Sequence, residues 1–245
     1  MRLRIDLKIF IFLFIFYLTK QMELYGFIMF FAFLHELGHL FAGILLKLRP
    51  EKIEIMPFGF SISFKISTKE YNRKIKKANL LELKKIGVAI AGPLTNFLII
   101  LITANTNIEI QKGLMIIYTN IVIILFNLLP IYPLDGGRIL KGILHIYKGK
   151  KISEKNINDI SIITTIFLTA IASIMILQEK NIAIFLIDIY LWYLVIKENK
   201  RYINKKIIYR RIEEIIDTRE KTIDKKEKLE EKENTGEYLE EKIKI

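Results

Sequence analysis

The sequence contains no cysteine and only three histidines among its 245 residues. The absence of cysteine excludes disulfides and thiolate metal sites, so any bound metal must be held by histidine or by a carboxylate. Charged residues make up 26% of the chain, yet they are scarce within apolar runs of about 15 to 25 residues, the length scale of membrane spans. This segregation predicts a membrane protein rather than a soluble domain.

Six apolar segments are candidates for transmembrane helices, although the first is short and would need tilt or local thinning of the bilayer. They are residues 7–19, 24–46, 86–103, 114–129, 160–177 and 182–196. The basic region before the first segment resembles a signal peptide, but no small-residue cleavage site follows it, so we expect a retained span. The sequence therefore predicts an all-α membrane protein with six transmembrane helices.

Positive charge is distributed unevenly between the two sides of this topology. With both termini in the cytoplasm, 35 of the 38 lysines and arginines fall in cytoplasmic segments. The three opposite loops hold one each, Lys20, Lys112 and Lys180. Since cytoplasmic loops of membrane proteins are enriched in basic residues, the asymmetry predicts this orientation. It also accounts for the net charge of +12, so we expect the lipid bilayer and no nucleic acid as a partner.

Two segments outside the spans have patterns of their own. Residues 53–66 alternate apolar with small or polar side chains, which predicts a small interfacial β-hairpin or edge strand, with an anchored loop as the alternative. Residues 201–245 form a charged cytoplasmic tail in which isoleucines keep helical spacing. We expect an amphipathic helix and then a disordered end, with a solvated charged helix as the alternative. The predicted domains are thus residues 1–200 and 201–245.

The most specific motif is HELGH at residues 35–39, inside the second predicted span. Residues four apart share a helix face, so His35 and His39 can bind one ion. Glu36 lies next to them and can act on a water molecule without occupying a coordination position. Ionisable side chains within a span are costly and usually functional; a hydrogen-bonded polar cluster between helices is the structural alternative.

A catalytic zinc site needs a third protein ligand. The candidate carboxylates are Asp135, within NLLPIYPLDGGR at residues 127–138, and Asp188 in the sixth predicted span. Asp135 is favoured because the prolines and glycines around it break the helix, and irregular backbone at membrane depth occurs where it is buried or lines a wet cavity. Asp188 can instead pair with a polar group of a neighbouring span. His145 falls in a basic loop and is expected to be a surface residue.

Polar and small residues near these motifs suggest further contacts. In AGPLTN at residues 91–96, Gly92 allows close helix packing, and Asn96 needs a polar partner in the core. Asn127 can hydrogen-bond an extended peptide or a ligand carboxylate. Arg138 either neutralises charge near the site or extends to the lipid headgroups.

The order and spacing of HELGH, AGPLTN and NLLPIYPLDGGR make residues 24–145 resemble the site-2 proteases, the intramembrane zinc metalloproteases of peptidase family M50. The six-span arrangement resembles the subgroup of stage IV sporulation protein FB. Many members of that subgroup also carry a nucleotide-responsive CBS domain, which the short charged tail of this chain does not resemble.

The resemblance implies a Zn²⁺-dependent endopeptidase in a bacterial cell membrane. Its substrate would be a membrane-spanning or membrane-associated regulatory protein, with a sigma-factor precursor in sporulation as one candidate. Its expected partners include inhibitory membrane proteins. The residues that match the family's motifs are His35, His39 and Asp135 as zinc ligands, Glu36 as the catalytic glutamate, and Asn127 and Pro133 near the substrate path.

Two other classes of protein compete with this interpretation. A membrane zinc-binding or transport protein would place further ligands along several spans, whereas here they concentrate at one point beside a glutamate. A catalytically silent scaffold that holds a partner helix is the third class. Zinc content measured together with proteolysis separates the three.

Overall fold

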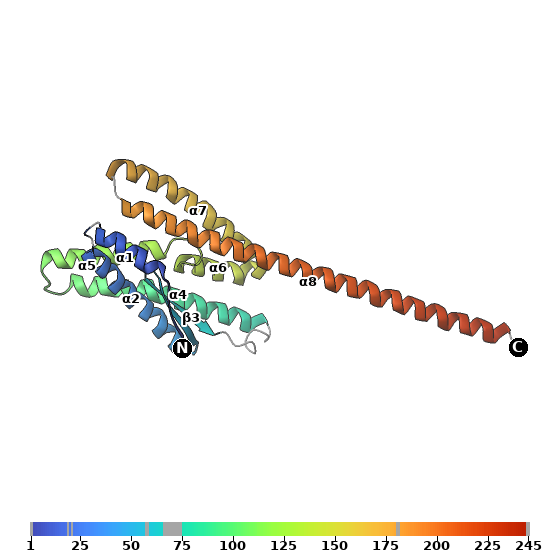
Figure 1. Ribbon diagram of the computed structural model, residues 1–245. Helices are drawn as coiled ribbons and strands as arrows, with labels where there is room; N and C mark the ends of the chain where they lie inside the picture. The colour runs from blue at the N-terminus through green and yellow to red at the C-terminus, as the bar shows by residue number, and fades with distance from the viewer. Residues whose placement is uncertain are drawn as a thin grey trace. The chain divides into compact units, whose positions relative to one another are not determined.

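The structure is a computed structural model that describes residues 2–18, 20, 22–56, 59–65, 75–179 and 182–243. The chain divides into two compact units, Met1–Glu198 and Asn199–Ile245. Helices dominate the fold (Figure 1). They are α1 (Lys8–Leu18), α2 (Met22–Leu45), α4 (Ile75–Ala104), α5 (Ile110–Asn127), α6 (Asp135–Lys148), α7 (Lys150–Glu179) and α8 (Ile182–Ile243).

Four of the described helices are long and apolar enough to cross a membrane. They contain the segments Tyr25–Leu45, Asn79–Ala104, Ile110–Asn127 and Lys150–Ile174. Many of their large apolar side chains are exposed on the protein surface, which is stable only where that surface meets lipid or another apolar partner. The chain is therefore a multi-pass membrane protein. The four segments correspond to the second to fifth predicted spans, and the count of six stays a prediction.

A small sheet accompanies the helices and contains β1 (Arg2–Ile5), β2 (Arg49–Met56) and β3 (Gly59–Lys65). The strand order is β1-β2-β3, with β1 parallel and β3 antiparallel to β2. The sheet includes the hairpin predicted from residues 53–66, whose turn at 57–58 lies outside the described residues. Strand β2 begins earlier than predicted, and β1 is a partner that the sequence did not indicate.

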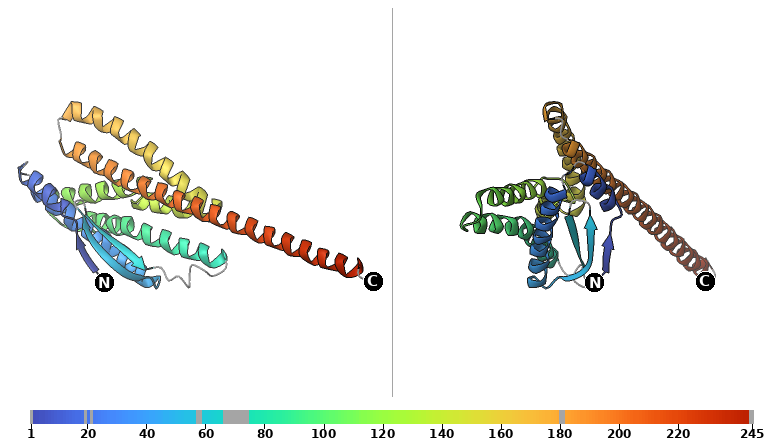
Figure 2. Two further views of the ribbon diagram at one scale, coloured as in Figure 1. Left: turned by 45° about the vertical axis from the view of Figure 1, so that its right-hand side comes forward. Right: turned by 60° about the vertical axis from the view of Figure 1, so that its left-hand side comes forward.

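The hairpin packs on α2, as the two views of Figure 2 show. Gly43 on α2 permits this contact, because a Cβ there would lie 2.2 Å from Cε1 of Phe64 on β3. Farther along the same helix, a Cβ on Gly38 would lie 2.1 Å from Thr95 Oγ1 on α4. Small residues thus let both β3 and α4 approach α2, the helix that carries HELGH.

Packing and a hydrogen bond to α7 hold the segment between α5 and α6. Ile131 is fully buried and clusters with Leu191 and Val195 of α8. The backbone N–H of Tyr132 donates to Ser161 Oγ of α7 at 3.0 Å. A Cβ on Gly136 would lie 2.1 Å from the Leu128 carbonyl oxygen, so only glycine allows the chain to fold back over the start of α6. These contacts position the first residue of α6, Asp135.

The second unit, Asn199–Ile245, is helical in its described residues, which extend to Ile243. The sequence predicted an amphipathic helix and then a disordered end, and the division of the tail into these two parts stays a prediction. The isoleucines of the tail are solvent-exposed at positions 203, 207, 208, 212, 215 and 216. A domain boundary at residue 200 stays a prediction.

Candidate metal centre

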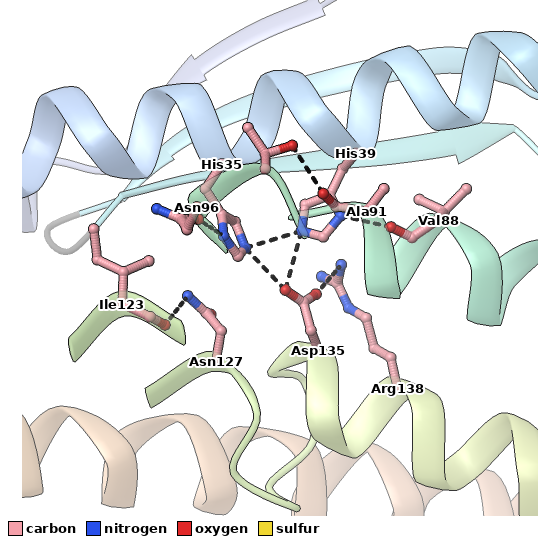
Figure 3. Close-up of polar contacts among 10 residues, drawn as sticks. His35, His39, Val88, Ala91, Asn96, Ile123, Asn127, Asp135 and Arg138 are labelled. Atoms are coloured by element: carbon pink, nitrogen blue, oxygen red, sulfur yellow. Dashed lines mark hydrogen bonds and ion pairs between the residues drawn. The ribbon is translucent and has the colours of Figure 1, made fainter. Parts of the chain in front are cut away.

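Three buried side chains converge between α2 and α6. His35 and His39 are one turn apart on α2, and Asp135 is the first residue of α6; each is at most 3% exposed. Asp135 Oδ2 lies 2.9 Å from His35 Nε2 and 3.0 Å from His39 Nε2, and the two Nε2 atoms are 3.1 Å apart (Figure 3). In the described part of the chain these three residues form a group that can hold a metal ion.

The hydrogen bonds behind the rings determine which nitrogen carries a proton. His35 Nδ1 lies 2.5 Å from Asn96 Oδ1, and His39 Nδ1 lies 2.7 Å from the Val88 carbonyl oxygen. Both partners are acceptors, so each Nδ1 must be the N–H donor. A neutral imidazole carries a single N–H, and therefore both Nε2 atoms point at Asp135 with a lone pair. Such outer hydrogen bonds are typical of metal-ligating histidines.

Two imidazole lone pairs and a carboxylate at 3 Å repel one another unless positive charge lies among them. Protons on the rings or a cation can supply that charge. Both lone pairs face the same carboxylate oxygen of Asp135, Oδ2. The other oxygen, Oδ1, lies 3.6 Å from Arg138 Nη1. Two imidazoles and a carboxylate are a donor set that suits catalytic zinc, so the residues fit this metal.

Glu36 extends the group on the same helix. Its Oε2 is buried and has no hydrogen-bond partner in the described part of the chain. Buried polar atoms are nearly always paired, so an unpaired carboxylate oxygen next to a metal-ligand set is unusual and needs an explanation. A carboxylate that exchanges protons with a reacting group needs a free oxygen, and the position of Glu36 fits that role.

Helix α4 lines the other side of the ligand atoms. A Cβ on Gly92 would lie 2.4 Å from His39 Nε2 and 2.5 Å from His35 Nε2. The backbone of α4 therefore passes directly beside the two nitrogens that would bind the ion. The sequence predicted Gly92 as a site of close helix packing. The atoms that Gly92 packs against are the Nε2 atoms of His35 and His39.

The remaining residues singled out from the sequence have other surroundings. Asn127 Nδ2 donates to the Ile123 carbonyl of its own helix at 3.0 Å (Figure 3). Pro133 lies between α5 and α6 and follows a cis peptide bond. Arg138, for which two roles were open, forms the ion pair with Asp135.

Two of the other residues considered lie outside the ligand group. Asp188 accepts a hydrogen bond from Thr169 Oγ1 on α7 at 2.9 Å, the kind of polar partner that the sequence suggested for it. The sequence placed His145 in a loop at the surface, whereas it lies on helix α6 and is partly exposed. Its side chain is only 19% exposed, because α6 packs against α4 and brings its Nδ1 within 3.7 Å of Glu82 Oε1.

Comparison with known proteins adds to this geometry. Residues 103–171, which include Asp135, match the profile of peptidase family M50. A zinc metalloprotease of Methanocaldococcus jannaschii is 30% identical over 189 residues, covering 73% of this chain and 50% of the relative. Residues 103–171 thus resemble a peptidase family M50 domain, and the chain resembles the site-2 proteases.

Two further similar proteins were found. Stage IV sporulation protein FB of Bacillus subtilis is 28% identical over 127 residues, covering 50% of this chain and 41% of the relative. The solved site-2 protease of M. jannaschii superposes with a TM-score of 0.53 at 24% identity, covering 80% of this chain and 89% of that structure, which shows a shared fold. The chain spans about half the length of the curated relatives it matches.

Proposed function

We propose that the chain is an intramembrane zinc metalloendopeptidase that cuts a membrane-spanning or membrane-associated regulatory protein. The observation that carries the proposal is the convergence of two imidazole Nε2 atoms and a carboxylate oxygen beside a glutamate with an unpaired oxygen. The relatives that bear the names zinc metalloprotease and site-2 protease support it.

The chain's own residues divide the chemistry among them. His35, His39 and Asp135 would hold the ion, and their outer hydrogen bonds orient them for it. Bound zinc supplies a Lewis acid that polarises the scissile carbonyl and lowers the pKa of a water molecule. Glu36 would accept a proton from the water as the water oxygen adds to the carbonyl carbon of the scissile bond. It would then deliver that proton to the leaving nitrogen as the C–N bond breaks.

An extended substrate suits this site, because a helical peptide has its carbonyls in i to i−4 hydrogen bonds. Strand β3 lies at the end of the strand order β1-β2-β3. Its outer edge can pair with an extended peptide, and its packing on α2 brings that edge near the helix of the ligands. Asn127 and Pro133 both lie shortly before Asp135 in the sequence. They would contact the peptide next to the scissile bond.

The proposal also includes the membrane arrangement. It places a six-span domain of residues 1–200 in a bacterial cell membrane, with both termini and the tail in the cytoplasm, where 35 of 38 basic residues then lie. Sigma-factor precursors belong among the substrates to be tested, as do membrane partners that restrain the enzyme.

The decisive experiment compares Glu36→Gln with wild type in co-expression with candidate membrane regulators and sigma-factor precursors. Cleavage should fall by at least about 100-fold, the usual loss when a general base is removed, while zinc content is unchanged. Glu23→Gln is the matched control, since Glu23 lies on the same helix and is exposed. Cleavage by Glu36→Gln at the wild-type rate would refute the role of Glu36, and zinc without any cleavage by wild type would favour the zinc-binding or transport class.

A further inference from the structure

Two buried asparagines form a chain of hydrogen bonds behind His35. Asn96 on α4 and Asn120 on α5 are both fully buried. Asn96 Oδ1 lies 2.5 Å from His35 Nδ1, and Asn96 Nδ2 lies 2.7 Å from Asn120 Oδ1. Asn120 Nδ2 in turn lies 2.8 Å from the Ile116 carbonyl oxygen of its own helix. The chain links three helices, α2, α4 and α5, and ends on a backbone group.

The direction of every hydrogen bond in this chain follows from its last member. A backbone carbonyl can only accept, so the amide nitrogen of Asn120 must face Ile116. The oxygen of Asn120 then faces Asn96 and must receive a donor, which turns the nitrogen of Asn96 toward it. The oxygen of Asn96 is left facing His35, where it accepts the Nδ1–H. Reversing either amide would place two acceptors or two donors against each other.

The two ligand histidines therefore obtain the same tautomer by different means. For His39 the Val88 carbonyl is sufficient to fix the tautomer, because a backbone carbonyl oxygen can only accept a hydrogen bond. For His35 the partner is a side-chain amide, which can present either its oxygen or its nitrogen. If Asn96 turned over, its nitrogen would favour the His35 tautomer with the proton on Nε2, and that nitrogen could no longer bind zinc.

We propose that Asn120 is a positioning residue of the metal centre, which holds the amide of Asn96 in the orientation that leaves His35 Nε2 free for zinc. The inference rests on the proposed zinc site, though not on the identity of any substrate. Outer hydrogen-bond partners of metal ligands typically contribute 10- to 100-fold to metal affinity. Asn120 acts one step farther out, so its loss should weaken zinc binding by about tenfold, the lower end of that range.

The test is a double-mutant cycle on zinc affinity, measured by chelator competition on the full chain in detergent. Asn120→Leu should raise the zinc Kd by about tenfold. In an Asn96→Ala background it should change the Kd by less than about twofold, because residue 96 then has no amide for residue 120 to orient. Asn120→Ala is the second variant, which removes the amide without requiring a leucine to fit.

Thr119→Val is the matched control for this cycle. Thr119 is the buried neighbour of Asn120 and also bonds to the carbonyl four residues earlier, Met115, but it does not reach Asn96. It should leave zinc affinity unchanged. An independent readout is the ¹⁵N-histidine spectrum of the zinc-loaded chain, in which Asn120→Leu should shift the Nδ1–H signal of His35 and leave that of His39 in place.

The outcomes separate this inference from the proposed function. Equal losses from Asn120→Leu in both backgrounds, or no loss beyond that of Thr119→Val, would show a packing role and overturn the positioning role while zinc and cleavage stay intact. Zinc binding with the expected cycle but no cleavage would overturn the protease alone. A wild-type chain that binds no zinc would overturn both.

Discussion

Two buried carboxylates, Asp135 and Asp188, lie in polar clusters of opposite chemical character. Around Asp188, Trp192 Nε1–H donates to Thr169 Oγ1 at 2.9 Å, and Thr169 Oγ1 lies 2.9 Å from Asp188 Oδ1. Donors therefore enter this cluster from the protein itself. Around Asp135 Oδ2, the nearest atoms are two imidazole nitrogens whose lone pairs face it.

The difference teaches how to separate a structural polar cluster from a metal site in a membrane protein. Burial is similar, since Asp135 is 3% and Asp188 9% exposed. What differs is the balance of hydrogen-bond donors and acceptors. The cluster of Asp188 contains an N–H and an O–H, whereas Asp135 Oδ2 faces two imidazole lone pairs, and Arg138 lies at the other oxygen, 3.6 Å away. A surplus of converging acceptors is thus the more informative observation.

The largest effect is expected from neutralising the carboxylate of Asp135. Asp135→Asn keeps the shape of the side chain but replaces a charged oxygen ligand by an amide. Zinc affinity should fall by more than about 100-fold, since even outer partners of metal ligands contribute 10- to 100-fold, and cleavage should be lost. Chelator competition on the purified chain measures the affinity, and retention of zinc at wild-type affinity would contradict the assignment of Asp135 as a ligand.

A second, smaller effect tests how closely the metal centre is packed. Gly92→Ala would place a Cβ 2.4 Å from His39 Nε2, so the imidazoles or α4 must shift. Overpacking of this kind typically costs 1–3 kcal/mol, and we expect about a tenfold loss of zinc affinity.

Gly26→Ala is the control for this change. No heavy atom lies within 4 Å of the Cβ position at Gly26 on α2, and alanine favours a helix over glycine. Zinc affinity should be unchanged in that variant. Equal affinities for the alanine variants at positions 26 and 92 would show that the ligands have room to move.

The part of the site that could be predicted from the sequence depends on local geometry. Helical periodicity places His35 and His39 on one face, and the broken helix around Asp135 distinguishes it from Asp188 within a regular span. Apolar runs of sufficient length located the helices α2, α4, α5 and α7 for the same reason. Each of these inferences needs only a few consecutive residues and the cost of burying polar groups in lipid.

The remaining features depend on contacts between distant segments. The partner of His39 is the carbonyl of Val88, a group that every residue has, so no side-chain pattern marks it. Asn120 is detectable as a polar residue in an apolar helix, but its link to His35 passes through Asn96 and appears only once three helices are packed. Strand β1 likewise pairs with β2 some 50 residues away in sequence.

The smallest predicted effect completes the comparison. Asp188→Asn keeps an oxygen that can accept from Thr169 Oγ1, so the cluster between α7 and α8 should persist with a stability change of about 1 kcal/mol or less, the range of a single hydrogen bond. Zinc affinity and cleavage should match wild type, and thermal unfolding in detergent would detect the stability change. The same substitution at two buried aspartates would then differ more than about 100-fold in zinc affinity. A loss of zinc affinity in Asp188→Asn would contradict this comparison. It would mean that the ion requires a carboxylate that already has hydrogen-bond donors, so the balance of donors and acceptors would not identify the metal ligand.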